Sequence, residues 1–585
     1  MLVSYFLSRT LVPTLVHLLL RGESETHRAP RGVFERVFAA FNRGFDRLRA
    51  WYGGLLALAL GHRVAVAGVF LVFVAGSAGL LLPLVGRVFF PSVDAGLIKL
   101  HVRGAPGTRI EESERHFAEI EDTIRTVIPS AAIDTMLDNI GTPYSGINLS
   151  LSEGTSISPA DGDILIALKE GHAPTPEYVR CLRKTLKDKY PQTTFFFLAP
   201  DISTQVLNFG LAAPIDLQVV GAVGSEEATL GVAKKLAARV ASVPGATDVH
   251  LAQVSNVPEI KIDVDRTMAR QQGLTERDIA SDLLISLSSS SQTSPSYWLD
   301  AKRGVQYLVA VQTPQSDLHS IAGLGSTPLS TGEGLAPQFL SNVAAVSRTT
   351  GPANVTHFNA ARTYDVQIGV DGTDLGSVAD AVNKIVADEK PHFPRGTTVR
   401  VKGQVESMES SFRGLGYGLV FAVLLVYLLM VVNFQSWLDP FVILMALPGA
   451  IAGIAWMLFL SHTTLSVPAL MGSIMCVGVA TANSILVVTF ANDQRKSGRD
   501  ASGAALAAGM TRLRPVLMTA LAMIIGMLPM SLGLGEGGEQ NAPLGRAVVG
   551  GLLLATVSTL FFVPVMYSML RRKAPKAHDP ELEAI

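Results

Sequence analysis

Long apolar stretches alternate with polar connections along this chain of 585 residues, and they predict helices that cross a membrane. A helix rises about 1.5 Å per residue and the hydrocarbon core of a bilayer is about 30 Å thick, so about 20 apolar residues make one crossing. Two such stretches precede the long polar segment Arg87–Ser410, and five follow it. They are Leu2–Leu20, Val64–Val85, Leu415–Asn433, Leu438–Leu460, Thr464–Phe490, Pro515–Leu532 and Leu544–Leu570. We therefore expect a polytopic α-helical membrane protein with a large α+β insert.

This pattern divides the chain into consecutive segments with distinct roles. We expect a partial transmembrane helix (1–20), a loop with an amphipathic helix (21–63), a transmembrane helix (64–86), an insert in three parts (87–272, 273–351 and 352–410), a bundle of five transmembrane helices (411–570) and a tail (571–585). The first helix is interpreted as partial because Met1 lies partway into the apolar stretch, so the chain is expected to be truncated at its start. The loop helix has two open interpretations, one in the membrane interface and one beneath the bundle.

Loop charge predicts the orientation. Basic residues gather in the connections 21–63 and 491–514 and in the tail that begins at Arg571. With seven crossings these three segments lie on one side, and the positive-inside bias makes that side the cytoplasm. The insert is then extracytoplasmic, which means periplasmic if the chain lies in the inner membrane of a Gram-negative cell.

The insert alternates between strand-like and helix-like hydrophobic periods. Four strand–helix–strand units recur, which predicts two ferredoxin-like subdomains, each a sheet with helices on one face. The units are Leu97–Val102, Ile110–Ile128 and Ala132–Leu137; Ile164–Leu168, Pro176–Lys189 and Thr193–Leu198; Ile215–Val220, Glu226–Ser242 and Thr247–Leu251; and Tyr364–Val370, Ser377–Ala387 and Thr397–Val401. A further strand is expected at Ile260–Val264, and residues 273–351 interrupt the order as a smaller inserted domain.

Composition excludes several classes of protein. Lys+Arg 48 balances Asp+Glu 49, so no basic domain for nucleic acid is present. The two cysteines, Cys181 and Cys476, fall in the insert and in a membrane span, and no Cys/His cluster has metal-ligand spacing. Walker A, GxSxG and HExxH motifs are absent from the sequence. We expect no enzyme, no catalytic residue, no metal site and no cofactor.

Four sequence segments carry a resemblance to a known family. They are Phe90–Gly96 (FPSVDAG), Gly478–Ala491 (GVATANSILVVTFA), Arg512–Thr519 (RLRPVLMT) and Phe561–Val565 (FFVPV). Together and in this order they resemble the resistance-nodulation-division (RND) superfamily, specifically the carboxyl-terminal half of a multidrug efflux permease of the hydrophobe/amphiphile type.

The resemblance implies a fold, an energy source and partners. The ferredoxin-like units would form a porter region and residues 273–351 part of a docking domain. Partners would be the amino-terminal half of the permease, further protomers of a homotrimer, a periplasmic adaptor and an outer-membrane channel. The proton gradient would supply the energy.

Proton coupling needs a titratable group inside the membrane, which costs about 2.5–3.5 kcal/mol on insertion scales. The five spans after the insert have no Asp, Glu, Lys, Arg or His at their centres, so this chain alone is not expected to carry protons. By resemblance, the proton-carrying aspartates lie in the other half, and Thr481, Asn483 and Thr519 complete a hydrogen-bonded relay. The alternative is that these polar residues only join packed helices. Ala482 stands where drug pumps typically have lysine, and Arg512 matches a position implicated in proton release, with membrane anchoring as its alternative.

A substrate pocket is implied by the strand Thr194–Pro200 (TFFFLAP), which resembles a family strand whose alternate phenylalanines line the pocket. Because alternate strand residues face opposite ways, Phe195 and Phe197 would face the ligand and Phe196 the packing layer. The alternative is that all three belong to the core of a buried sheet. Tyr144, in the Gly/Ser-rich stretch 139–159, is a further pocket candidate.

These observations lead to one functional hypothesis and two alternatives. The hypothesis is a proton-driven exporter of amphiphilic compounds or drugs in the inner membrane. One alternative is an RND-like auxiliary protein for lipid or protein export, or a sterol-sensing receptor. The other is a non-functional fragment of a transporter. Substrate identity rests on the resemblance alone.

Overall fold

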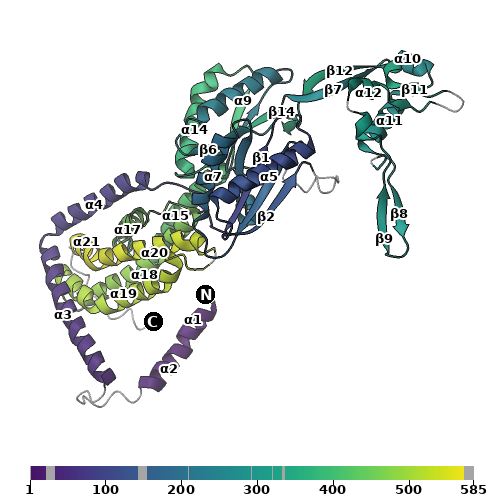
Figure 1. Ribbon diagram of the computed structural model, residues 1–585. Coiled ribbons are helices and arrows are strands. Elements are labelled where there is room, and N and C mark those ends of the chain that lie inside the picture. The colour runs from purple at the N-terminus through teal and green to yellow at the C-terminus, as the bar shows by residue number, and fades with distance from the viewer. Residues whose placement is uncertain are drawn as a thin grey trace. The chain divides into compact units, whose positions relative to one another are not determined.

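The computed structural model of this chain describes residues 2–20, 33–142, 155–208, 210–291, 293–318, 320–331, 336–535 and 537–571. The chain forms two compact units (Figure 1). One combines Met1–Gly86 with Ser411–Ile585, and we call it the helical unit. The other is Arg87–Ser410, which we call the mixed unit.

Six segments of the helical unit are long and apolar enough to cross a membrane, judged on the residues that the structure describes. They are Arg63–Leu84 (α4), Gln404–Phe434 (α15), Leu438–Leu460 (α16, Leu438–Leu444, and α17, Leu447–Leu460), Val467–Lys496 (α18), Ala501–Ser531 (α19) and Gly538–Leu570 (α20, Gly538–Val557, a π-helical turn, Ser558–Phe562, and α21, Val563–Leu570). The mixed unit separates α4 from α15, as the hydrophobic pattern predicts.

The first apolar stretch does not form one membrane-length helix. It forms two short helices, Leu2–Arg9 (α1) and Leu11–Leu20 (α2), separated at Thr10. Pro13 explains the break, because its ring lacks an N–H and collides with the carbonyl of Arg9, four residues earlier. The predicted seventh crossing is therefore not among the six.

The predicted start of the sixth transmembrane helix was wrong. Pro515 was expected to begin the helix, but α19 already begins at Ala501 and contains both Pro515 and Pro529. Membrane helices tolerate internal proline because neighbouring groups satisfy the freed backbone carbonyls. The polar segment before Pro515 is thus part of one long helix.

Small residues set the packing of the helical unit. A Cβ on Gly453 of α17 would overlap the carbonyl of Gly550 on α20, and one on Gly472 of α18 would lie 2.6 Å from the Leu544 carbonyl oxygen. Glycine therefore lets these backbones approach closely, as is usual where lipid supplies no hydrophobic drive between helices.

The amphipathic loop helix, α3 (Val33–Gly61), is partly packed and partly exposed. Tyr52 is buried and its hydroxyl donates to the Leu560 carbonyl at 2.6 Å, and Leu56 is also buried. Phe41 and Trp51 are exposed. Its second half therefore packs on the helical unit, as one of the two interpretations requires.

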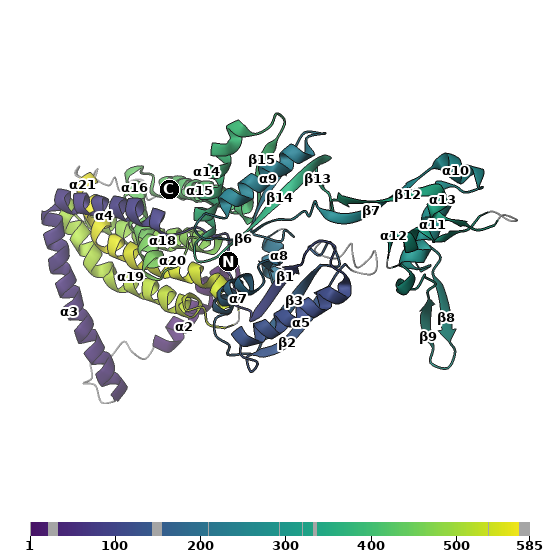
Figure 2. The same ribbon diagram turned by 45° about the horizontal axis from the view of Figure 1, so that its top comes forward.

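The first sheet of the mixed unit has the order β2-β3-β1-β4 and is antiparallel throughout. Its elements run β1 (Leu97–Arg103), α5 (Ile110–Val127), β2 (Ile133–Ile140), β3 (Asp161–Leu168), α7 (Thr175–Lys189) and β4 (Thr194–Leu198). This β-α-β-β-α-β order is that of a ferredoxin-like unit. Leucines and isoleucines of β1 and β3 form one core with Phe117 and Leu182 of the two helices, so α5 and α7 cover a single face (Figure 2).

The second sheet repeats this order with different residues. β5 (Ile215–Val220), α9 (Glu226–Val240), β6 (Ala246–Leu251), β14 (Ala361–Val370), α14 (Leu375–Glu389) and β15 (Thr398–Gly403) place the strands in the order β6-β14-β5-β15. A short strand, β13 (Thr356–Phe358), also pairs with β14. Leu217 and Val366 are fully buried beneath α9 and α14, which leaves the alternate residues on a helix-free face.

An insertion separates β6 from β14, and it begins earlier than predicted. The strand expected at Ile260–Val264 is β7 (Val257–Val264), and it pairs along its whole length with β12 (Ala344–Gly351) instead of joining the second sheet. The ribbon leads to helices α10 (Arg266–Gln271), α11 (Glu276–Ser288), α12 (Ile321–Gly325) and α13 (Leu340–Val343), a short pair β10 (Pro328–Leu329) and β11 (Gln338–Phe339), and the hairpin β8 (Ser296–Asp300) and β9 (Val305–Val309) (Figure 1).

Candidate functional site

The helix-free face of the first sheet is polar and buried. His101 of β1 has no exposed side-chain surface, and its Nδ1–H donates to the Asp163 carboxylate on β3 at 2.6 Å. Lys99 Nζ lies 3.8 Å from the other oxygen of Asp163. Arg103 Nε lies 3.3 Å from Asp161, which is 1% exposed. Each buried acid on this face therefore has a basic partner, as burial of charge requires.

Phe196 of β4 lies between two histidine rings. Its ring centroid is 4.4 Å from that of His101 and 3.7 Å from that of His250 on β6, with both pairs stacked. The Arg103 guanidinium carbon lies 5.5 Å from the Phe196 ring centroid, and the same guanidinium donates to the Leu251 carbonyl. We call His101, Arg103, Asp163, Phe196 and His250 the inter-sheet layer, because it joins the two sheets of the mixed unit.

Burial lowers the pKa of His250 to about 4, and the charge of Arg103 adds to this effect. His250 is therefore neutral at physiological pH; its Nδ1–H donates to the Asp248 carbonyl oxygen at 2.7 Å, and its Nε2 lies 3.1 Å from the side-chain amide of Gln367. A neutral imidazole stacked on phenylalanine lets the two sheets meet without an extra buried charge.

Ion pairs close the same junction at its edge. Arg183 of α7 donates to both oxygens of Asp248, at 2.8 and 2.9 Å, and to Asp371 at 2.9 Å. Arg180 reaches Asp371 at 3.1 Å. We call Arg180, Arg183, Asp248 and Asp371 the clamp. A two-pronged guanidinium–carboxylate pair fixes orientation as well as distance, so the clamp sets how the two sheets meet.

The predicted pocket phenylalanines do not lie as expected. Alternation along β4 is confirmed, but Phe195 and Phe197 are on the face covered by α5 and α7, where they pack against the core of the first sheet. Arg183 lies over Phe197, 5.2 Å from its ring centroid. The expected faces are therefore exchanged, because the helices cover the side of β4 that was assigned to a ligand. Tyr144 lies outside the described residues.

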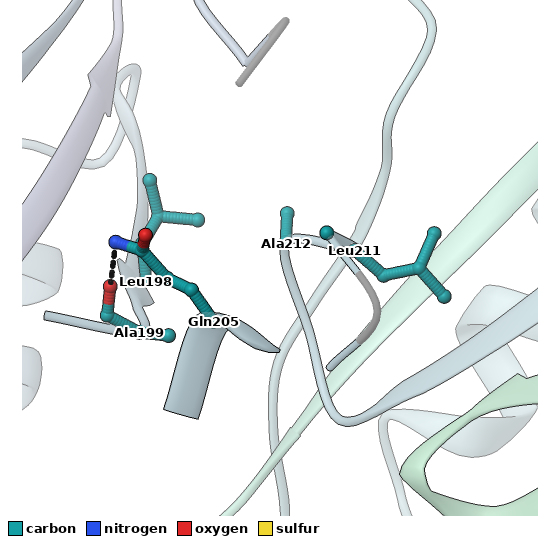
Figure 3. Close-up of a pocket in the computed structure, with 6 residues that line it drawn as sticks. Leu198, Ala199, Gln205, Leu211 and Ala212 are labelled. Carbon is teal, nitrogen blue, oxygen red and sulfur yellow. Dashed lines mark hydrogen bonds between the residues drawn. The ribbon is translucent and has the colours of Figure 1, made fainter. Parts of the chain in front are cut away.

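A small pocket follows directly after β4. It is lined by Leu198, Ala199, Gln205, Gly210, Leu211 and Ala212 and has a volume of about 60 Å³ (Figure 3). Gln205, in the short helix α8 (Ile202–Leu207), donates from Nε2 to the Ala199 carbonyl at 3.2 Å. Pockets for drug-sized molecules measure about 300–1,000 Å³, so this one is too small for such a ligand.

Two of the three relay candidates in the helical unit meet. The Thr519 hydroxyl donates to Asn483 Oδ1 at 2.7 Å, which joins α19 to α18. Thr481 is buried and donates to the Val477 carbonyl of its own helix at 2.6 Å, so it does not reach the other two. Arg512 places its guanidinium carbon 4.9 Å from the Phe490 ring centroid. This geometry favours helix packing for Thr481 and leaves a relay through Asn483 and Thr519 as a prediction.

One buried acid was overlooked because the sequence scan covered only the centres of the spans. Asp439, at the first turn of α16, is 3% exposed and accepts hydrogen bonds from Arg571 at 2.9 and 2.5 Å and from Asn492 at 3.1 Å. Tyr567 in turn donates to Asn492 at 2.6 Å. In the sequence, the Asp-Pro pair at the start of α16 and Arg571 at the end of α21 were the features that could have indicated this buried acid and its partner. This acid is already paired with a base.

Acidic and imidazole side chains are the donor types that bind metal cations, but their arrangement matters. Among the residues that the structure describes, no group of three or more His, Cys, Asp or Glu side chains could hold a metal ion. His101 and His250 lie on opposite faces of Phe196, so that ring keeps the two imidazoles apart.

The chain is similar to known proteins along almost all of its length. The AcrB/AcrD/AcrF family model matches residues 1–571. The cobalt-zinc-cadmium resistance protein CzcA of Cupriavidus metallidurans is 27% identical over 99% of this chain and 52% of its own length. The nickel and cobalt resistance protein CnrA of the same organism is also 27% identical, over 99% and 52%. The swarming motility protein SwrC of Bacillus subtilis is 26% identical over 98% and 52%.

A solved structure is also similar to this chain over almost its whole length. A crystal structure of a heavy metal efflux pump superposes with a TM-score of 0.77 and 25% identity, over 91% of this chain and 52% of that one. The chain thus spans about half the length of the curated relatives it matches.

Proposed function

Because this chain belongs to the AcrB/AcrD/AcrF family, a family of RND permeases, we propose that it is the carboxyl-terminal half of an inner-membrane efflux permease that exports heavy-metal cations. The observation that carries the substrate class is the similarity of 99% of the chain to relatives named for cobalt, zinc, cadmium and nickel resistance. This proposal replaces the amphiphilic substrate expected from the sequence.

The mixed unit supports a small cationic substrate better than a large apolar one. Phe195 and Phe197, the expected aromatic lining, are partly buried and pack against the core of the first sheet, and the pocket beyond β4 has a volume of about 60 Å³. The helix-free face beside them is polar, and its buried acids Asp161 and Asp163 are already paired with Arg103, Lys99 and His101. Amphiphiles need apolar contact area, which neither this polar face nor the small pocket supplies.

Export of amphiphilic compounds is a second candidate, and one observation favours it. An apolar groove of about 370 Å³ runs along α4, lined by Ala65, Val66, Val69, Phe70 and Phe73. Its volume suits a drug-sized molecule and it has no polar group to orient a cation. A substrate that enters from the bilayer would meet such a groove.

The two β-α-β-β-α-β units would act as the porter region and the insertion between β6 and β14 as part of a docking domain. The hairpin β8–β9 supports contact with a partner, because Tyr297, Trp298 and Leu299 are all exposed. An isolated two-stranded hairpin is marginally stable in water, so a covering partner would stabilise it. The expected partners are further protomers of a homotrimer, an adaptor and an outer-membrane channel.

The proton gradient would drive export, with the proton-carrying acids supplied by the part of the permease that this chain does not match. Asp439 is engaged in an ion pair with Arg571. Asn483 and Thr519 would extend a relay from those acids. Movement would reach the mixed unit through α15, which runs without a break from Gln404 into the helical unit.

The proposal predicts metal export that depends on both halves. The chain is expressed with the amino-terminal half of a similar permease in a host that lacks its own metal-efflux pumps. We expect lower intracellular zinc, cobalt or cadmium and higher metal resistance than with either half alone. In everted vesicles, zinc transport should stop when a protonophore collapses the pH gradient.

The controls separate the candidates. Resistance to amphiphilic dyes without any metal export would favour the groove on α4 and contradict the metal proposal. Proton-dependent zinc transport by this chain alone would contradict the view that its proton carrier lies elsewhere. Matched membrane levels of each half, measured by immunoblot, are required before the comparison.

A further inference from the structure

Two buried acids on the helix-free face of the second sheet are diagonal neighbours on adjacent strands, and no base among the described residues pairs with them. Asp216 of β5 is 1% exposed and Asp365 of β14 is 8% exposed. The backbone register pairs Asp365 with Gln218 and Gln367 with Asp216, so Asp216, Gln218 and Asp365 are neighbours on one face of adjacent strands. Buried carboxylates are normally paired with a base or a metal, so this arrangement needs an explanation.

Three oxygens of this group have no hydrogen-bond partner among the described residues. They are Asp216 Oδ1, Gln218 Oε1 and Asp365 Oδ1, and all three are buried. A buried acceptor without a partner costs about 1–3 kcal/mol, and more if it is charged. Three such oxygens on adjacent positions indicate that they share one missing partner.

Neighbouring groups hold one oxygen of the Asp365 carboxylate and leave the other without a partner. Its second oxygen, Oδ2, accepts hydrogen bonds from Gln253 Nε2 at 2.7 Å and from the Thr356 hydroxyl at 3.2 Å. Its backbone N–H donates to Gln253 Oε1 at 2.8 Å. Metal-binding carboxylates are typically held in this way by groups behind them, which leaves one oxygen free for the ion.

The bases on the next strand are engaged elsewhere. β15 places Lys402 opposite Asp216 and Arg400 opposite Gln218. However, Lys402 Nζ donates to Glu406 at 2.8 Å, and the Arg400 guanidinium carbon lies 5.0 Å from the Phe358 ring centroid. In the described part of the chain, neither base forms an ion pair with Asp216.

A proton alone does not account for the site. Burial and the charge of Asp365 raise the pKa of Asp216 to about 8, and burial also raises the pKa of Asp365. The Gln218 side chain hydrogen-bonds to Asp216, so one proton shared by the two carboxylates would satisfy their oxygens but still leave the Gln218 amide oxygen without a donor. A cation can bind all three oxygens and neutralise the repulsion between the acids.

We propose that Asp216, Gln218 and Asp365 form a binding site for a hard divalent cation, such as calcium or magnesium, that bridges β5 and β14. Two carboxylates and an amide carbonyl are oxygen ligands, which these ions prefer, whereas copper and zinc sites usually contain sulfur or nitrogen. The ion would brace the second sheet, and it is distinct from the exported metal of the proposed function.

The test measures cation binding to the purified full chain in detergent. Equilibrium dialysis with ⁴⁵Ca²⁺, and competition with Mg²⁺, Mn²⁺ and Zn²⁺, are carried out at pH 7.5 on the wild type, Asp216→Asn, Asp365→Asn and the control Asp388→Asn. Asp388 is exposed on α14, and its replacement by asparagine removes the same charge as the two site variants do. We expect one Ca²⁺ site with an affinity near 0.1–1 mM, as in extracellular calcium modules. Each of the two site variants should weaken it at least about tenfold, while Asp388→Asn should not change it.

Folding and chemistry are checked separately. The site variants lose a like-charge repulsion, so without added metal they should remain folded at least as well as the wild type by thermal unfolding. Ca²⁺ should raise the melting temperature of the wild type and of Asp388→Asn only. Absence of Ca²⁺, Mg²⁺ and Mn²⁺ binding up to several millimolar, or retained binding in both site variants, would overturn the proposal. Binding of Zn²⁺ alone would overturn the assignment to hard cations.

Discussion

The two sheets of the mixed unit share one strand order, yet their helix-free faces differ in how they treat buried charge. On the first sheet, Asp163 is within 4 Å of both His101 and Lys99, and Asp161 faces Arg103. On the second sheet, Asp216 and Asp365 lie beside each other with no base in contact among the described residues. The fold creates a helix-free face in both sheets. The residues on that face decide whether its buried charges are paired within the protein or need a ligand.

Replacing an aspartate by asparagine should therefore change the free energy of unfolding in opposite directions on the two faces. The larger change is expected on the first sheet. Asp163→Asn removes the carboxylate that His101, whose side chain is fully buried, pairs with. Loss of one member of a buried ion pair costs roughly 3 kcal/mol or more, and we expect a decrease of that order in the free energy of unfolding of the mixed unit. Pulse proteolysis in urea, read on the fragment that spans Arg87–Ser410, measures it. An unchanged urea midpoint would show that the pairing is not needed.

Loss of an arginine from the clamp, at the junction between the sheets, should lower the free energy of unfolding by a smaller amount. Arg183→Met removes three charged hydrogen bonds of the clamp, but Arg183 is 24% exposed, so water replaces part of the loss. We expect a decrease of about 1.5–3 kcal/mol, the usual value for a hydrogen bond to a charged group. Arg180→Met is the matched control, because Arg180 is 54% exposed and contacts only Asp371 among the described acids. Surface ion pairs contribute about 0–1 kcal/mol. Equal losses in both variants would refute a special role for Arg183.

Local patterns predicted the elements of this molecule well. Alternating strand and helix periods located eight strands and the four helices of the two sheets, because each signal depends on neighbouring residues, but they missed the short strand β13. Alternation also placed Phe196 opposite Phe195 and Phe197. Which face the helices cover depends on the packing of α5 and α7, and this is why the expected ligand face was exchanged with the core face.

The candidate sites depend on contacts between distant residues, which sequence patterns do not reveal. Asp216 and Asp365 read as ordinary polar positions of two strands until the register places them together. In the same way, Asp439 at the first turn of α16 meets Arg571 after the end of α21. The strand β7 had a clear pattern, but its partner β12 could not be identified from it.

The smallest predicted effect tests the unpaired face directly, through pH. Burial and Asp365 raise the pKa of Asp216 to about 8, compared with about 4 in the unfolded chain. The folded protein then holds a proton that the unfolded chain releases, so the stability from this group is complete below about pH 4 and is lost as pH rises through about 8. Asp216→Asn cannot titrate and should lose less stability between pH 5.5 and pH 8.5.

Pulse proteolysis in urea with EDTA measures the free energy of unfolding, which should fall less for Asp216→Asn than for the wild type between pH 5.5 and pH 8.5; each pKa unit corresponds to about 1.4 kcal/mol. Asp163→Asn must not show this gain, because its parent carboxylate is paired. Addition of Ca²⁺ at pH 8.5 should narrow or reverse the difference, since an ion that stabilises two ionised carboxylates restores the wild type and has no equivalent site in the variant. Identical pH profiles for wild type and Asp216→Asn would show that Asp216 does not titrate in this range, and the contrast between the two faces would then rest on geometry alone.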